Sequence, residues 1–204
     1  MPKKIAPAFY FIGNHLILDF INTKIAVEGK PFDLLDNYVA LLKWLCKTEL
    51  ISIEEADLYE QRWGSDGRGE QTLTVARELR DSLLNIIEQR KAGEKYPRKS
   101  VENINKLLEN QIITTKLVWI DNTFVSEKHV NMLEPLHVLI PIAEAAVDFF
   151  SQYSIHLVKK CENPECVLYF YDNSKNSTRR WCSQKTCGNR IKVAAYLERQ
   201  RNKI

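Results

Sequence analysis

The sequence predicts a mainly α-helical protein in two parts. These are a helical N-terminal domain over residues 1–153 that contains a small β-hairpin, and a small C-terminal domain over residues 154–204. Three observations support this fold class. Apolar residues recur at helical spacing through much of the first part. Seven glycines and seven prolines in 204 residues are few for a loop-rich chain. Four of the five cysteines form two matched pairs after residue 160, which sets the C-terminal part apart from the rest.

The N-terminal domain begins with an apolar segment at residues 9–23 that periodicity allows as a strand or a helix. Leucines at helical spacing then predict a helix over residues 33–48, and Asp33 is a suitable residue to cap it. Ser52 and Glu55 have the spacing of a capping box, which predicts a second helix from Ser52 to about residue 63. These segments supply the first apolar faces of the expected helical core.

The glycine-rich segment 64–69 is interpreted as a surface loop. No strand precedes it and no Gly-Lys-Ser/Thr follows it, as a phosphate-binding loop would require. Further along, Pro141 either kinks a helix or marks its start. The remaining predicted elements are helices over 72–92, 101–110 (capped by Ser100) and 135–152, and a hairpin over 117–125 with a two-residue turn. The apolar face expected for the helix at 135–152 consists of Leu136, Leu139, Ile140, Ala143, Val147 and Phe150.

The formal net charge of +3 is unevenly distributed along the chain. Residues 156–204 contain eleven Lys or Arg against four Asp or Glu, a net charge of +7, which leaves −4 for the rest. A basic tail on an acidic body is typical of proteins that contact nucleic acid. There is no run of eighteen apolar residues, and the N-terminus lacks the features of a signal peptide. We therefore expect a cytoplasmic location and no membrane partner.

The paired cysteines indicate a metal site. Cys161 and Cys166 are separated by four residues, as are Cys182 and Cys187, with fifteen residues between the pairs. Four thiolates are a complete tetrahedral set for one structural zinc ion and leave no open position for catalysis. The alternatives are two disulfides, four unrelated buried thiols, or an iron–sulfur cluster. Cys46 lies alone in an apolar helix and is interpreted as a buried small hydrophobe.

The residues around the cysteines predict a small β-hairpin followed by a helix. Residues 167–171 are strand-like, 172–177 form a turn, and 178–181 are expected to return as the second strand. A helix should follow Cys187 and run to about residue 201. A knuckle, a hairpin and a helix that carries the last ligand are the parts of a treble-clef-like zinc finger.

Several C-terminal motifs resemble those of the CGNR zinc-finger family. They are the C-x4-C pair, Phe170-Tyr171-Asp172, the segment Ser177-Thr178-Arg179-Arg180-Trp181-Cys182-Ser183, and Cys187-Gly188-Asn189-Arg190. Leu18-Asp19-Phe20-Ile21-Asn22-Thr23 and Leu42-Lys43-Trp44-Leu45 are similar to motifs of the ABATE domain that accompanies this finger. The family is regarded as bacterial transcription regulators, some of them tied to stress. The resemblance therefore implies a DNA-binding regulator with an N-terminal domain for effector sensing or dimerisation.

The basic residues of the finger are the candidate DNA contacts. In the last helix, Ile191, Val193, Ala194, Ala195 and Leu197 are expected to face inward, and Lys192, Arg199 and Lys203 outward beside Tyr196. Arg179 and Arg180 should point to opposite faces of the returning strand, one toward a phosphate and the other toward a local partner such as Asp172. The complete set of candidate DNA-binding residues is Lys175, Arg179, Arg180, Asn189, Arg190, Lys192, Arg199 and Lys203.

Other functions remain open at this stage. Asp19, Asn22 and Thr23 could line a small-molecule effector pocket, or could satisfy backbone groups at a helix end. The chain could instead be a zinc-braced protein-interaction module, or an RNA-binding protein that stacks bases on Tyr169, Tyr171 or Trp181. A homodimer is possible, since one finger alone would read DNA weakly. No known catalytic motif is present, so we expect no enzymatic activity.

Overall fold

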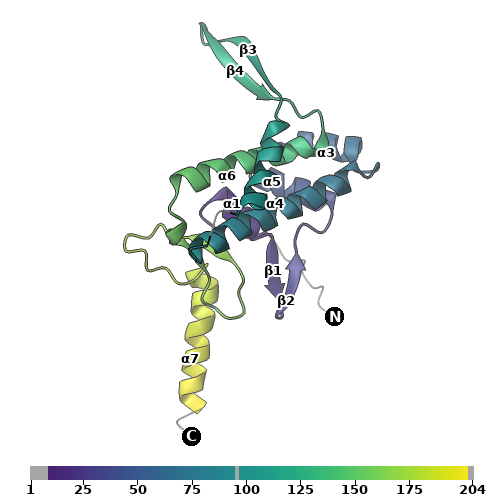
Figure 1. The fold of residues 1–204 in the computed structure, drawn as a ribbon. Helices are drawn as coiled ribbons and strands as arrows, with labels where there is room; N and C mark the ends of the chain where they lie inside the picture. The colour runs from purple at the N-terminus through teal and green to yellow at the C-terminus, as the bar shows by residue number, and fades with distance from the viewer. Residues whose placement is uncertain (1–8, 95–96, 202–204) are drawn as a thin grey trace.

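The computed structural model describes residues 9–94 and 97–201. Its body is a bundle of helices arranged around the long helix α4, with two short hairpins attached, and the C-terminal finger lies at one end (Figure 1). The body helices are α1 (Leu16–Ile21), α2 (Tyr38–Lys47), α3 (Ile53–Trp63), α4 (Arg68–Lys91), α5 (Arg98–Glu109) and α6 (Ile140–Gln152), the last preceded by the 3-10 helix η1 (Pro135–Leu139). The predicted mainly helical class is confirmed.

Helix α4 is the centre of the hydrophobic core: α1, α2, α3 and α5 pack against it, and α6 packs on α1 and α5. At 24 residues it spans about 36 Å. It buries an apolar stripe against fully enclosed aromatic side chains of the neighbouring helices. The stripe consists of Leu73, Ala76, Leu79, Leu83, Ile86 and Ile87, and the aromatic side chains are Phe20, Trp44, Trp63 and Phe149.

The helix starts depend on local caps, some of which differ from the prediction. The capping box is confirmed, because Ser52 Oγ accepts from the Glu55 amide and the Glu55 carboxylate accepts from the Ser52 amide. The predicted Asp33 cap is wrong: α2 begins only at Tyr38 and Asn37 caps it. Helix α4 begins at Arg68, earlier than predicted. The predicted Ser100 cap is wrong: α5 begins at Arg98, and Ser100 lies inside the helix, where its hydroxyl accepts from Asn85.

Two hairpins interrupt the helices. Strands β1 (Lys24–Val27) and β2 (Lys30–Asp33) form a hairpin that the sequence analysis did not identify. Strands β3 (Ile113–Ile120) and β4 (Thr123–Val130) form the predicted hairpin, which is longer than expected. Its two-residue turn, Asp121-Asn122, is confirmed by positive φ angles of 47° and 64°. The β3–β4 hairpin projects away from the bundle (Figure 1).

Leu139, Ile140 and Ala143 are buried as predicted, but the second half of α6 faces the core one residue earlier than predicted. Ile142, Ala146 and Phe149 are fully buried, whereas Val147 is 46% exposed and Phe150 is half-buried. The reason is that α6 begins at Ile140, with Pro141 in its first turn, where no helical N–H is required. Residues 135–139 form the separate 3-10 helix η1. A helical face counted from Leu136 at α-helical spacing therefore does not predict which residues of α6 face the core. Among the described helices, none is long and apolar enough to cross a membrane.

Candidate metal centre and nucleic-acid interface

The C-terminal finger begins with a hairpin whose turn is the first cysteine knuckle. After the 3-10 helix η2 (Ile155–Leu157), β5 (Val158–Lys160) pairs with β6 (Tyr169–Tyr171). The pairing of β5 and β6 encloses Cys161 and Cys166 in the connecting loop. The predicted strand pair is therefore wrong: residues 178–181, all of them described, form no strand. Their partner position is already taken by β5, and the Arg179 amide bonds the Asp172 carboxylate.

The four cysteine sulfurs converge on one point. Their Sγ atoms all lie within 4.8 Å of one another. Cys182 Sγ lies 3.7 Å from Cys166 Sγ and 3.6 Å from Cys187 Sγ. A tetrahedron with Zn–S bonds of about 2.3 Å has sulfur–sulfur edges of about 3.8 Å, which these separations match. All the cysteines are free thiols, so the disulfide alternative is wrong. The cluster fits one structural zinc ion.

The clustered thiols shift one another's pKa values. Hydrogen bonds from Cys182 and the other thiols lower the pKa of Cys166 to about 5. The contact with Cys166, together with burial, raises the pKa of Cys182, and burial raises that of Cys161. A divalent ion is needed for all four to be thiolates at once.

Two N–H donors orient the sulfurs. The buried Asn163 side chain donates its Nδ2–H to Cys187 Sγ at 3.4 Å, and the Cys182 amide donates to Cys161 Sγ at 3.4 Å. Cys187 itself lies in the short π-helical turn η3 (Gln184–Gly188) that leads into α7 (Asn189–Arg201). Such donors to metal-bound thiolates fix the ligand geometry. Asn163 was not predicted to support the zinc site. Its position in the turn between Cys161 and Cys166 is the sequence feature that could have identified it.

The finger shares its hydrophobic core with the body. Ile25 of β1 and Leu34 pack into one cluster with the ligand cysteines and with Leu168 and Phe170 of the finger. The N-terminal segment contributes further backbone contacts, since the Tyr171 amide donates to the Gly13 carbonyl at 2.8 Å. Part of the finger's apolar core is thus supplied from about 130 residues away in the sequence.

The proposed effector-pocket residues have internal partners. The Asn22 amide, 1% exposed, forms two 2.8 Å hydrogen bonds with the backbone of Tyr169, donating to its carbonyl and accepting from its N–H. Asp19 accepts from the Gly13 amide, and Thr23 donates to the Phe20 carbonyl while accepting from Arg80. The structure therefore corrects the pocket hypothesis in favour of the alternative: these side chains satisfy backbone groups and, through Asn22, fix the finger to the body.

Replacing Asn22 with Asp tests this clamp. The carboxylate can still accept from the Tyr169 N–H, but it cannot donate to the Tyr169 carbonyl and it would be a buried charge. We expect a loss of about 1–3 kcal/mol in unfolding free energy and faster hydrogen exchange in β6. Asn110→Asp, at an exposed helix end, is the matched control and should change neither. Equal effects of the two substitutions would contradict the clamp.

Asp172 organises the rest of the finger. Its buried carboxylate accepts from Lys159 Nζ at 2.6 Å, from the Ser174 hydroxyl at 2.6 Å and from the Arg179 amide at 2.9 Å. Burial alone would raise the pKa of Asp172, but the hydrogen bonds from Lys159 and Ser174 outweigh it and lower the pKa to about 2. Lys159 was not among the predicted functional residues. Because its ammonium group is paired with Asp172, it is not a free cation for binding DNA.

Arg179 and Arg180 face different surroundings, although residues 178–181 form no strand in which side chains would alternate. The Arg179 guanidinium lies over the Phe170 ring at 4.2 Å and donates to the carbonyls of Trp181, Cys182 and Ile12. Arg180 is exposed, bonds Glu162 at 2.6 Å and lies over Trp181. Arg179 is therefore the arginine that makes local contacts within the finger. Its guanidinium binds backbone carbonyls, and Lys159 is the cation that binds the Asp172 carboxylate.

These two arginines form a matched pair for mutation. Arg179→Ala removes the guanidinium that binds the Cys182 carbonyl beside a zinc ligand, so we expect faster loss of zinc to a chelator and a lower melting temperature. Arg180→Ala removes an exposed ion pair, which contributes about 0–1 kcal/mol, and an exposed contact with the Trp181 ring. It should leave zinc release unchanged and lower the melting temperature less than Arg179→Ala does. Zinc release followed with a colorimetric chelator measures the difference. Equal release rates would show that Arg179 does not support the metal site.

Helix α7 projects from the finger away from the bundle (Figure 1). No residue of this fully described helix is buried, and only Ile191 is even half-buried. The predicted inward face is therefore wrong for Val193, Ala194, Ala195 and Leu197, because no other part of the described chain covers α7. Hydrophobic and basic residues alternate around the helix instead of separating into two faces.

The remaining candidate DNA contacts lie on the finger surface. Lys175, in the loop after β6, and Arg190 and Lys192 are exposed. Asn189 donates to the Lys185 carbonyl and Arg199 to the Ala195 carbonyl, both at exposed positions. Lys203 lies outside the described residues. The structure thus brings Asn189, Arg190, Lys192 and Arg199 together on one helix and places Lys175 and Arg180 on the adjoining loops.

Comparison with known protein families gives two matches. Residues 158–200 match the model described as "CGNR zinc finger". Residues 14–153 match the ABATE model, described as "Putative stress-induced transcription regulator". A search of curated proteins returned no match. Together with the four-cysteine cluster, the matches support a regulatory, zinc-binding role. Since one model covers more than half of the chain, the protein belongs to the ABATE family and carries a C-terminal CGNR zinc finger.

Proposed function

We propose that this protein is a DNA-binding transcription regulator in which α7 enters the major groove. The observation that supports this most directly is the isolation of α7: it stands clear of the body with every residue but Ile191 exposed. Its 13 residues span about 20 Å. The major groove is about 12 Å wide and admits one α-helix. The zinc ligand Cys187, just before the helix, fixes its direction.

The order of side chains around α7 suits such a role. Ile191, the least exposed residue, marks the side toward the finger. At 100° per residue, Asn189, Val193, Tyr196 and Gln200 fall within about 60° of one another on the opposite side. This group is the proposed base-reading face, because it offers amide groups for bases and apolar surface for thymine methyl groups.

The basic residues of α7 lie on both flanks of that face. Lys192 and Arg199 fall about 90° to one side of it, and Arg190 and Arg201 about 90° to the other. A helix lying in the major groove has a phosphate backbone along each side. Cations on both flanks can therefore contact both strands, which a single basic face could not do.

The alternative functions have less support. Base stacking on RNA would need free aromatic rings, but Tyr169 is buried with its hydroxyl bonded to Glu88, and Tyr171 packs against Phe149 and Tyr153. The Trp181 ring is half-buried, and the Arg180 guanidinium lies over it. A protein-interaction role would be favoured by the exposed apolar residues Leu117, Trp119 and Phe124 of the β3–β4 hairpin. That surface is separate from the basic α7, so it would complement DNA binding.

Salt-dependent binding to duplex DNA tests the proposal. The wild-type protein should bind random duplex DNA with an affinity that falls steeply as salt rises. The double variant Lys192→Ala, Arg199→Ala should lose about two phosphate contacts and lower the slope of log K against log salt by about 2. Fluorescence anisotropy with a labelled duplex measures both quantities.

The matched control is Lys47→Ala, an exposed cation at the end of α2 in the body. It should leave the slope unchanged. Tyr196→Ala should weaken binding to a selected sequence more than binding to random duplex. Absence of binding at low salt, or an equal loss with Lys47→Ala, would contradict the DNA proposal and favour the protein-interaction alternative.

A further inference from the structure

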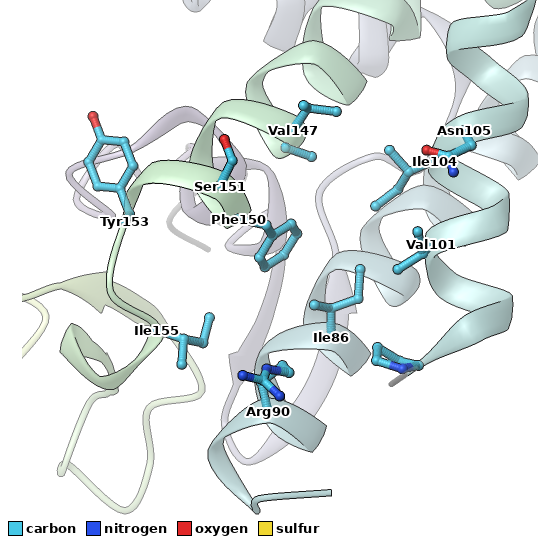
Figure 2. Close-up of a pocket in the computed structure, with 12 residues that line it drawn as sticks. Ile86, Arg90, Val101, Ile104, Asn105, Val147, Phe150, Ser151, Tyr153 and Ile155 are labelled. Atoms are coloured by element: carbon cyan, nitrogen blue, oxygen red, sulfur yellow. The ribbon is translucent and has the colours of Figure 1, made fainter. Parts of the chain in front are cut away.

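A groove in the body, far from the zinc ligands, has the features of a small-molecule site. It lies between α4, α5 and α6 and the connector to the finger, and its volume is about 490 Å³. Figure 2 shows Ile86, Val101, Ile104 and Phe150 pointing into it from three helices. Ligand pockets in proteins usually measure about 300–1,000 Å³ and have mostly apolar walls. The α4–α6 groove fits that description.

One end of the groove carries a positive charge without a balancing one. Arg90, near the C-terminal end of α4, lines the groove beside Ile86 and Ile155 (Figure 2). Among the residues that the structure describes, none forms a hydrogen bond or an ion pair with its guanidinium, and none of those lining the groove is acidic. The other polar groups are the neutral side chains of Asn105, Ser151 and Tyr153.

We propose that the α4–α6 groove binds a small amphipathic carboxylate, with its apolar chain against Ile86, Ile104 and Phe150 and its carboxylate on Arg90. The apolar walls favour a ligand with a hydrocarbon chain, and the Arg90 guanidinium favours one with a negatively charged end. Guanidinium and carboxylate form bidentate, charge-assisted hydrogen bonds that a neutral alcohol cannot reproduce. The positive charge of Arg90 thus favours a carboxylate over a neutral or cationic ligand.

The groove is physically continuous with the attachment of the finger. Tyr153 and Ile155, which line it, lie in the connector between α6 and β5. The Tyr153 ring lies against Tyr171 of β6 at 5.4 Å, and Lys91, next to Arg90, donates to the Val158 carbonyl of β5 at 2.6 Å. A ligand in the groove therefore contacts the same connector and helix end that hold the finger. This coupling rests on the proposed DNA-binding function, whereas ligand binding itself does not.

Calorimetric titration of the full-length protein with decanoate and with 1-decanol tests the proposal. We expect decanoate to bind at least tenfold more tightly than 1-decanol. Arg90→Leu should weaken decanoate binding at least tenfold and leave 1-decanol binding unchanged, which abolishes the preference. Val147→Trp, at a half-exposed wall position, should fill the groove and weaken both ligands. The matched control is Arg68→Leu at the opposite end of α4, which should behave as wild type.

No decanoate binding, equal affinity for the two probes, or an unchanged affinity in Arg90→Leu would each overturn the proposed site. Thermal denaturation of each variant without ligand identifies any variant that fails to fold, and in that case Arg90→Lys, which keeps the charge but not the bidentate geometry, should give an intermediate preference. A second titration with labelled DNA present tests the coupling. Decanoate binding without any DNA binding would leave the groove proposal intact and contradict only the DNA proposal.

Discussion

Replacing Cys182 with Ser is expected to abolish zinc binding and to unfold the finger from β5 to α7. Cys182 Sγ lies 3.7 Å from Cys166 Sγ and 3.6 Å from Cys187 Sγ, and its loss leaves three thiolates without a closed tetrahedron. Structural zinc sites contribute roughly 10–16 kcal/mol in finger peptides, which exceeds the stability of a domain this small. Elemental analysis should fall from one zinc per chain to none, and hydrogen exchange over residues 158–200 should become fast.

The matched control is Cys46→Ser. This half-buried thiol donates only to the Ser52 carbonyl at 3.4 Å, a bond that serine can also form. The variant should retain one zinc and the wild-type exchange pattern. Chelation of the wild-type protein should reproduce the Cys182→Ser pattern. In both cases protection should also fall at β1 and Leu34, since their apolar side chains lose the cover of the finger core. A fully protected finger without metal would show that zinc is not structural.

Replacing Arg80 with Met should cost about 3–5 kcal/mol of unfolding free energy, the range for breaking a buried ion pair. The Arg80 side chain is 3% exposed and binds the Asp33 carboxylate through both terminal nitrogens, at 2.7 and 2.5 Å. Burial alone would raise the pKa of Asp33, but the hydrogen bonds and charge of Arg80 outweigh it and lower the pKa. Without Arg80, the carboxylate at the end of β2 keeps the Leu35 amide, at 3.0 Å, and the partly exposed Arg77.

The pH dependence gives a second readout of this pair. A lowered folded-state pKa means that the pair contributes its full stability above the ordinary Asp pKa of about 3.9. That contribution is lost as the pH falls through the lowered value, so the wild type and Arg80→Met should approach each other in stability in acid. Chemical denaturation at a series of pH values measures this.

Arg77→Met serves as the control for the Arg80 substitution. Arg77 reaches the same carboxylate at 3.5 Å but is 38% exposed, so its loss should cost only about 1 kcal/mol. A double replacement, Asp33→Leu with Arg80→Met, should be less destabilised than Arg80→Met alone because no buried charge is left unpaired. Equal losses for Arg77→Met and Arg80→Met would show that burial of the pair is not the source of its strength.

Local signals in the sequence predicted local features well. The capping box at Ser52, the two-residue turn at Asp121 and the four zinc ligands each depend on residues a few positions apart, and each is found in the structure. Errors arose where a distant residue decides the outcome. Asp33 is not a helix cap because Arg80, 47 residues away, binds it. The strand predicted at 178–181 is replaced by β5, which precedes the knuckle.

The last helix shows a different limit of periodicity. Its apolar residues were assigned to an inward face on the assumption that the helix packs on something. Among the described residues, Ile191 is the only residue of α7 that is even half-buried, so the helix packs against almost nothing. Its apolar pattern therefore does not mark an inward face. Likewise, Asn22 could be recognised as a buried polar residue at a helix end, but its partner, the backbone of Tyr169, lies 147 residues further along the chain.

The dependence of the finger on the first strands of the protein has a consequence during synthesis. Ile25, Leu34 and the Gly13 carbonyl leave the ribosome early, but their partners are translated about 150 residues later. At about 5–20 residues per second, that interval is roughly 8–30 s. Until the finger folds, Ile25 and Leu34 of the nascent chain form an uncovered apolar patch. Chains that are truncated or starved of zinc keep that patch permanently, which distinguishes them from finished molecules for chaperones and proteases.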